Sequence, residues 1–297
     1  MRSQQQHFDI GTDALSSSPA TAQPRAIIYR TRGSTHGPIT RLVSPSDLGE
    51  FLKPFVFLDL FGFDTAGGHK GFGMHPHSGI ATLTYLIEGD TLYEDTTGEQ
   101  GVLRSGGVEW MRSGNGVWHT GAPAPGVARV RGFQLWVALP ADTENAPAHS
   151  LYLAPPQVPR DGPARVLLGS YGAATSPVPA PAPMTYLAVH LQDGQRWRFT
   201  PPAGQTVAWF AVNAGRLDAG DSDPIGAGEL AMLEESGDAI DFVAHGETAF
   251  VLGSAGKHPH DLVMGHYSVH TSPQALAKGE AEIARIGAQL RAQGRLG

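Results

Sequence analysis

Residues 71–89, GFGMHPHSGIATLTYLIEG, decide the fold and carry the first candidate site residues. His75 and His77 flank Pro76 in an extended run, and side chains in a strand alternate between its two faces, so both imidazoles point the same way. A strand rich in β-branched and apolar residues follows at 82–87. Two imidazoles on one face can share a metal ion when a third ligand comes from elsewhere. The stretch therefore predicts a strand that holds half of a metal site.

The block that can complete this site is GVEWMRSGNGVWHTGAP, residues 107–123. Its central residues 113–116, SGNG, predict a tight hairpin turn, after which the returning strand presents His119. Three imidazoles from two strands make a facial set that suits a divalent transition metal. We therefore interpret His75, His77 and His119 as metal ligands.

Further strands are expected on both sides of these blocks, at intervals of roughly ten residues with Gly-rich turns between them, which suits a barrel or a sandwich. The 38 glycines and 23 prolines favour the same all-β class over a helical bundle. The expected strands form a first series at 25–32, 55–63, 82–87, 108–111, 117–120 and 131–139, and a second at 165–168, 184–190, 197–200, 206–212, 229–233, 239–243 and 248–253.

The chain length of 297 residues and the two strand series predict two domains. Residues 1–24 are polar and are expected to form a flexible segment. Residues 25–145 would form an N-terminal barrel that holds the metal site. Residues 146–297 would form a metal-free C-terminal barrel with a helical tail. The proline-rich run 140–163 marks the crossover, with a further strand at 150–153.

The tail begins with a helix start signal, in which Ser272 caps the helix and Pro273 occupies its first position. Apolar residues then recur at helical spacing, and this face is expected to pack on a barrel. These residues are Leu276, Ile283, Ile286 and Leu290.

Composition narrows the function classes. The net charge is −7 with no basic run, which argues against direct binding of nucleic acid or of an anionic membrane. The absence of cysteine excludes disulfides and thiolate sites. The N-terminus lacks the apolar core of a signal peptide, and no run of about 18 apolar residues occurs. We expect a soluble, cytoplasmic protein.

Other histidines and acids have simpler interpretations. His258 and His260 form a second H-P-H, but they lie in a loop without a complementary third ligand and are expected outside the barrel. His190 and His245 stand alone in the second strand series, which is why that barrel is expected to be metal-free. Residues 94–95, Glu-Asp, precede a turn and are interpreted as a solvated hairpin end.

A group of large apolar residues near the histidines has two interpretations. These side chains could line a pocket for a flat aromatic ligand, or they could pack in the core, which is the commoner role. The residues are Phe63, Phe72, Met74, Trp118 and Trp136.

Six blocks together carry a family resemblance that runs from about Arg41 into the C-terminal helix. In chain order they are PFVFLDLFGF, HPHSGIATLTYLIEG, EDTTG, VEWMRSGNGVWH, FQLWVALP and MGHYSVHTSPQAL. They resemble the pirins, which are two-barrel cupins related to bacterial quercetinases. The resemblance implies an all-β fold of tandem cupin β-barrels, a bicupin, with a short C-terminal helix and the site in the first barrel.

The resemblance also implies a ligand set, from which this chain departs. The resemblance to pirins implies four metal ligands: the two histidines of HPH, a later histidine and a glutamate two residues after it. In this chain Gly121 stands where that glutamate would be. Another glutamate of the general cupin pattern is replaced by Ala81 or Thr82. Glu109 stands where the pirin pattern usually has Gln, and it could supply a carboxylate if it faces inward. The sequence does not fix that direction.

Two functions of different class follow. The first is a quercetin 2,3-dioxygenase-type oxidoreductase, which would act on a flavonol-like enediol through one divalent transition metal on three histidines. Iron is the preferred ion, with Cu, Mn, Ni or Zn as alternatives. The second is a non-catalytic regulatory protein with a degenerate site, similar to pirins that act as transcriptional cofactors. A small aromatic or anionic ligand suits the first function, and a protein partner suits the second.

Overall fold

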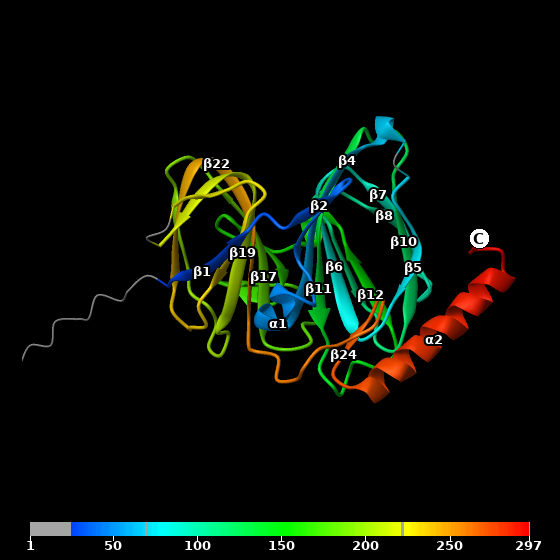
Figure 1. Ribbon diagram of the computed structural model, residues 1–297. Helices are drawn as coiled ribbons and strands as arrows, with labels where there is room; N and C mark the ends of the chain where they lie inside the picture. The colour runs from blue at the N-terminus through cyan, green and yellow to red at the C-terminus, as the bar shows by residue number, and fades with distance from the viewer. Residues whose placement is uncertain (1–24, 69, 221–222, 297) are drawn as a thin grey trace, which may run out of the picture.

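Two β-barrels lie side by side, and a long C-terminal helix runs along the outer side of one of them (Figure 1). The computed structural model describes residues 25–68, 70–220 and 223–296. The segment 1–24, expected to be flexible, lies outside the described residues. The described chain is mostly strand with one long helix, and the expected all-β class is confirmed.

The first barrel is built from two antiparallel sheets. In the larger sheet the strand order is β12-β9-β6-β11-β4-β3-β2, and in the smaller it is β5-β10-β7-β8. The larger sheet contains β2 Ser34–His36, β3 Ile39–Val43, β4 Phe55–Asp64, β6 Ile80–Glu88, β9 Val108–Arg112, β11 Arg129–Ala138 and β12 His149–Leu153. The smaller contains β5 Phe72–His77, β7 Thr91–Asp95, β8 Gln100–Leu103 and β10 Val117–Pro123.

The second barrel is one nine-stranded sheet in the order β1-β21-β19-β22-β17-β14-β13, with β18 and β20 paired to β22 and β19. Its strands are β1 Ile27–Thr31, β13 Arg160–Asp161, β14 Ala164–Leu168, β17 Met184–Leu191, β18 Arg196–Phe199, β19 Val207–Ala219, β20 Ile225–Gly226, β21 Leu230–Leu233 and β22 Ile240–Ala255. The remaining elements are the strand pairs β15 Ser170–Tyr171 with β16 Ala174–Thr175 and β23 Val263–Met264 with β24 Val269–His270, helices α1 Leu48–Leu52 and α2 Pro273–Ala292, and the 3-10 turns Thr65–Gly67 and Pro155–Gln157.

Strand alternation divides the apolar residues between the barrel interiors and a core that the barrels share. On β4, Leu58 packs in the shared core, whereas Phe61 and Phe63 point into the first barrel. On β19, Trp209 packs in the shared core and Phe210 inside the second barrel. Because side chains of a strand alternate between its faces, each of these strands contributes side chains both to the shared core and to the interior of its own barrel. The barrels are therefore one packed body.

Three segments belong to the barrel formed mainly by the other part of the chain, whereas the sequence predicted a division into 25–145 and 146–297. Strand β1 pairs with β21 of the second barrel, and β12 pairs with β9 of the first. The tail returns to the first barrel, where Ser268 bridges to Ser78 beside the histidine strand. A strand pattern in sequence gives a strand's faces but not its partner, and the sequence pattern therefore could not place these segments.

Helix α2 packs on the histidine strands. Ser272 Oγ accepts a hydrogen bond from the N–H of Ala275, as the predicted cap requires. Glycines on its inner face allow the close approach: a Cβ at Gly287 would lie 2.8 Å from the ring of Trp118 on β10. The Trp118 indole N–H donates to the carbonyl of Ile283 at 3.0 Å.

Within the described part of the chain, no helix is long and apolar enough to cross a bilayer.

One expectation about the second series was wrong in detail. The strands predicted at 239–243 and 248–253 are a single strand, β22. Its pairing with β19 shifts register at two places, and such irregularities let a long strand bend around a barrel without ending. The exposed Gly246, with φ of 73°, lies near this bend. Glycine in this conformation is typical of a turn, although here the strand continues through it.

Candidate metal centre

Antiparallel strands β5 and β10 bring the predicted histidines together. His119 pairs directly with His75, and Val117 pairs with His77. Directly opposed residues in an antiparallel pair share a face, and His75 and His77 share one because they are two residues apart. Pro76 is tolerated because β5 is the edge strand of its sheet. All three imidazoles therefore face the interior of the first barrel.

The turn at residues 113–116 exists, but it does not form the predicted hairpin. Strands β9 and β10, which flank it, belong to different sheets of the barrel. The Gly116 N–H closes the turn on the carbonyl of Ser113 at 2.9 Å. Gly114 has φ of 51°, and a Cβ there would lie 2.0 Å from the carbonyl oxygen of Ala146. The turn thus carries the chain across a barrel edge, which delivers His119 to the opposite sheet from Glu109.

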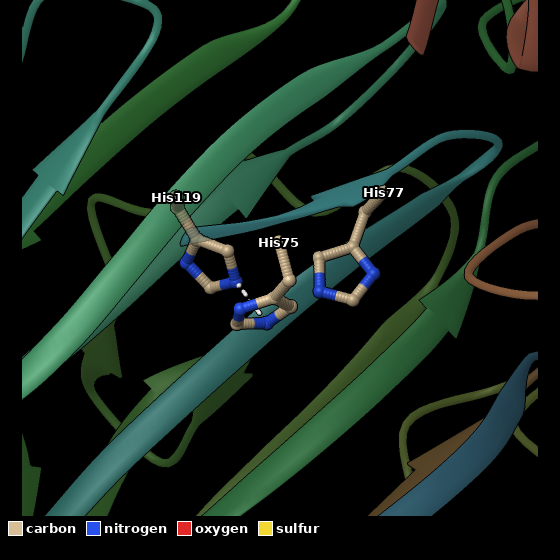
Figure 2. Close-up of side chains that lie close together, drawn as sticks. All are labelled: His75, His77 and His119. Atoms are coloured by element: carbon tan, nitrogen blue, oxygen red, sulfur yellow. Dashed lines mark hydrogen bonds between the residues drawn. The ribbon is translucent and has the colours of Figure 1, made fainter. Parts of the chain in front are cut away.

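The three rings converge on one point, as Figure 2 shows. One nitrogen from each ring lies within 4.8 Å of the others. His119 Nε2 and His75 Nε2 are 3.0 Å apart. Two nitrogens bound at about 2.1 Å to one ion and about 90° apart are separated by roughly 3.0 Å. The spacing of this pair thus fits neighbouring positions around one metal ion.

Each ring has its Nδ1 next to an oxygen, and in His75 and His77 the contact is a hydrogen bond that fixes the tautomer. His75 Nδ1 lies 2.7 Å from the carbonyl oxygen of Gly73, and His77 Nδ1 lies 3.1 Å from that of Tyr267. His119 Nδ1 lies 3.5 Å from Glu109 Oε1, longer than an ordinary hydrogen bond. Carbonyl oxygens only accept, so in His75 and His77 Nδ1 carries the proton and Nε2 presents its lone pair. Such partners orient metal-binding histidines.

Burial keeps the imidazoles of His75 and His77 neutral, which metal binding requires. Desolvation, with a smaller contribution from His119, lowers the pKa of His75 to about 4. Desolvation also lowers the pKa of His77 well below its ordinary value. Near neutral pH both rings therefore offer an unprotonated nitrogen.

The residues present fit a bound cation. His77 Nε2 is buried and has no hydrogen-bond partner, and a buried polar atom in that state is costly unless something binds it. His75 Nε2 and His119 Nε2 are 3.0 Å apart, so one proton joins them in the metal-free protein, and a cation bound by both would replace that proton. Among the described residues, His75, His77 and His119 are the one such group of three potential ligands. The cluster therefore fits a divalent metal site.

Glu109 faces the barrel interior, the direction that the sequence left open. Its neighbours Val108 and Trp110 pack in the shared core, so alternation turns Glu109 the other way. It is 7% exposed. Burial raises the pKa of Glu109, but the His119 ring and the Tyr152 hydroxyl lower it by more, and the net shift is downward.

Tyr152 links Glu109 to a second buried carboxylate. Its hydroxyl lies 2.9 Å from Asp95 Oδ2 and 3.3 Å from Glu109 Oε1. Burial, reinforced by both carboxylates, raises the pKa of Tyr152, and the hydroxyl remains a donor. Asp95 is only 3% exposed, which corrects its interpretation as part of a solvated hairpin end. This contact could not be predicted from residue order, because β12 and β7 are far apart in the chain.

A small cavity of about 50 Å³ opens beside the histidines. At about 10–15 Å³ per water, it holds a few waters or one end of a flat ligand. Gly121 lies on its wall, and a Cβ at this position would meet no atom within 4 Å. Space for a carboxylate side chain therefore exists where the family pattern has its glutamate. The aromatic wall consists of Phe61, Phe63, Phe72 and Tyr93.

The aromatic residues singled out in the sequence take both expected roles. Phe63 and Phe72 line the cavity. Trp136 stacks on Phe57 at a centroid distance of 4.1 Å and contacts the His77 ring edge-on. Trp118 faces outward to α2, and Met74 does not line the cavity. Phe61 and Tyr93 were missed because their positions depend on the barrel's closure.

The C-terminal tail supplies a contact to the site that the sequence did not predict. Tyr267 covers the histidines, with its ring centroid 6.2 Å from those of His75 and His77. Behind it, His270 Nε2 lies 2.9 Å from Ser78 Oγ, and His270 Nδ1 lies 3.1 Å from Glu144 Oε2. These three residues resemble a hydrolytic triad in order, but all three are buried. They fasten the tail to the histidine strand.

The remaining histidines lie away from the centre. His258 is buried in the connection after β22, and its ring faces His260 at 5.5 Å. His190 and His245 are half-exposed on the second barrel, where each contacts one carboxylate. They do not converge with one another. That the second barrel binds no metal stays a prediction.

The fold and the histidine cluster define a class of protein, the two-barrel cupins. A crystal structure titled as quercetin 2,3-dioxygenase from Acinetobacter baumannii superposes with a TM-score of 0.77 over 89% of this chain and 94% of that chain, at 23% identity. A structure of the protein GK1651 from Geobacillus kaustophilus has a TM-score of 0.70 at 25% identity, over 80% of this chain and 98% of that one.

Sequence comparison then identifies the family. The Pirin family model matches residues 38–137. A Pseudomonas aeruginosa protein named "Putative quercetin 2,3-dioxygenase PA3240" is 34% identical over 243 residues, which cover 76% of this chain and 82% of the relative. A pirin-like protein from Caulobacter vibrioides is 43% identical over 104 residues, 35% of this chain and 37% of the relative. The chain belongs to the pirin family.

Proposed function

We propose that this pirin is a metal-dependent dioxygenase of the quercetinase type. His75, His77 and His119 would hold one divalent transition metal, preferably iron, and a flavonol-like enediol would be the substrate. The observation that carries the proposal is the convergence of three Nε2 atoms while each Nδ1 lies beside an acceptor. Imidazole ligands suit iron as well as copper, nickel and zinc. The names of relatives such as the Pseudomonas protein support the substrate class.

The chain's own residues would prepare the site for such a ligand. When bound, a divalent metal supplies Lewis acidity that favours the deprotonated form of an enediol. Phe61, Phe63 and Phe72 exclude water from the cavity and offer flat apolar surfaces to a ring. The cavity of about 50 Å³ admits one edge of a three-ring molecule rather than the whole. The enediol edge would therefore insert and the remaining rings would lie toward the opening.

Metal content and oxygen consumption test the proposal together. The protein would be purified without added metal, analysed by mass spectrometry for bound metals, and then mixed with quercetin in an oxygen-electrode cell. We expect near-stoichiometric iron and oxygen uptake that a His77→Ala variant lacks. Metal without uptake for quercetin or smaller enediols would contradict the dioxygenase and favour the regulatory alternative. Absence of metal, with no binding on reconstitution, would contradict the metal centre itself.

A further inference from the structure

We propose that Glu109 is the positioning residue of the metal centre. Its carboxylate would orient His119 from the Nδ1 side and supply the centre's negative charge without itself binding the metal. This inference rests on the proposed metal site but not on the dioxygenase reaction.

The first argument is the burial of a carboxylate beside a ring. Glu109 is 7% exposed and His119 is 4% exposed. Among the ion pairs of the described residues, the one partner of Glu109 is His119, and no lysine or arginine contacts it. A buried carboxylate is costly unless a positive group compensates it. A divalent ion bound to the far nitrogen of His119 would provide that compensation through the ring.

The second argument is geometric and separates this role from direct ligation. Glu109 Oε1 lies 3.5 Å from Nδ1 of His119, whereas the nitrogen that meets His75 is Nε2. The two ring nitrogens point in divergent directions, so the carboxylate lies behind the ring as seen from the metal position. Consistently, the group of mutually close ligand atoms contains the three histidines and not Glu109. A carboxylate, a histidine and a metal in this order form a recurrent outer-sphere arrangement.

The third argument is that Glu109 is itself held in place. The Tyr152 hydroxyl has one proton and lies between Glu109 Oε1 and Asp95 Oδ2. Asp95 is fixed in turn, because its Oδ1 accepts from the N–H and hydroxyl of Thr97 at 2.7 and 2.6 Å. The ring of Tyr152 stacks on Tyr93 with centroids 3.5 Å apart. This support from β12 and β7 restricts the carboxylate to the His119 side of the cavity.

The consequence concerns charge. A divalent ion on three neutral imidazoles keeps its full charge, and Gly121 offers no carboxylate to reduce it. Glu109 would lower the net charge of the centre by one from outside the coordination sphere. The coordination position on the Gly121 side would then remain open for an anionic oxygen ligand.

Metal titration of matched variants tests the role. Wild type, Glu109→Gln and Glu109→Leu would be titrated with Co²⁺, whose visible absorption reports occupancy and coordination geometry. Gln is nearly isosteric and can still accept from Nδ1, so it removes the charge alone, and we expect about tenfold weaker binding. Leu removes charge and acceptor, and its loss should approach about a hundredfold. Glu247→Gln, which alters a Glu–His contact on the second barrel, is the control and should change nothing.

A double-mutant cycle distinguishes positioning from a merely structural effect. Gly121→Glu places a carboxylate in open space beside the site, and its gain in Co²⁺ affinity should be larger in Glu109→Gln than in wild type, because the two charges serve one ion. Equal gains, or unchanged affinities for both Glu109 variants, would overturn the positioning role and leave the metal centre standing. A change of Co²⁺ coordination number in Glu109→Gln would instead make Glu109 a ligand and overturn the outer-sphere role. Failure of the wild type to bind Co²⁺ would overturn both proposals.

Discussion

The two barrels of this protein have the same architecture and fill their interiors differently. The second is closed by apolar side chains in which aromatic rings contact one another, as Phe210 and Phe242 do at 5.2 Å. The first places three histidines and Glu109 inside and keeps a cavity beside them. An interior that is packed throughout can stabilise a fold but leaves no space for a ligand. The difference shows that a ligand site requires polar side chains at interior positions that the second barrel fills with apolar ones.

The comparison extends to how each barrel depends on the rest of the chain. The first barrel receives β12, the tail around Tyr267 and helix α2 from later in the sequence. The second barrel receives β1 from earlier in the sequence, at its edge. The barrel with the candidate site is therefore supported by several segments from later in the chain. Such support is what a precise ligand geometry needs.

The largest effect should come from emptying the packed barrel. Phe210→Ala removes a fully buried ring and should lower the free energy of unfolding by about 3–5 kcal/mol. Phe63→Ala, beside the existing cavity of the first barrel, should cost less because the site is already incompletely filled. Denaturant unfolding measures both, and Co²⁺ affinity should stay unchanged in Phe210→Ala. Equal losses for the two variants would remove the distinction between a packed and an open interior.

The next effect should be confined to the first barrel. His77→Ala removes a ligand nitrogen that has no other partner, and we expect the metal dissociation constant to rise by more than about a hundredfold, the upper range for outer-sphere changes. His190→Ala on the second barrel is the matched control, because that imidazole contacts only a carboxylate at the surface. Isothermal titration with Co²⁺ or Ni²⁺ measures the difference. Similar constants for the two variants would place the metal elsewhere.

A third change tests whether the tail supports the site. Glu144 accepts from the N–H and hydroxyl of Thr271 at 2.7 and 2.6 Å and contacts His270. Glu144→Gln turns one acceptor into a donor, which should lower stability by about 1–3 kcal/mol. Metal affinity should fall a few-fold, because the Tyr267 carbonyl that orients His77 lies in the same segment. Thermal unfolding and metal titration check both, and a stability loss with unchanged affinity would separate the tail from the site.

The smallest effect is a pH dependence of the connection between the barrels. Burial, followed by His260 and Lys53, lowers the pKa of His258 to about 4 from an ordinary value near 6.5. Between about pH 4 and 6.5 the unfolded chain therefore binds more protons than the folded chain. The free energy of unfolding is unaffected by His258 above about pH 6.5 and falls as the pH is lowered toward 4. Between pH 7 and 5 the loss from this group should be on the order of 1–2 kcal/mol. Denaturant titrations of metal-free protein should show a flatter pH profile for His258→Gln, and an unaltered slope would count against this origin.

Local patterns in the sequence were sufficient to predict the fold class and the three histidines that converge. The period-two alternation of strands put His75 and His77 on one face, and six blocks in register identified the tandem cupin fold. The cap at Ser272 and the helix after it were also predicted correctly. These features depend on neighbours within a few residues, and such interactions are visible in the order of residues alone.

Only the tertiary structure decided what surrounds the ligands. Glu109 and Trp110 point to opposite faces of β9. Trp110 faces the core shared by the barrels because the second barrel packs on that face, and this contact is not visible in the order of residues. The Tyr267 carbonyl reaches His77 across 190 residues of chain, and Tyr152 joins Asp95 across 57. Strand patterns specify which face of a strand is apolar but not which strand lies beside it. The sequence by itself therefore determined the three imidazoles, and barrel closure determined the groups that orient them.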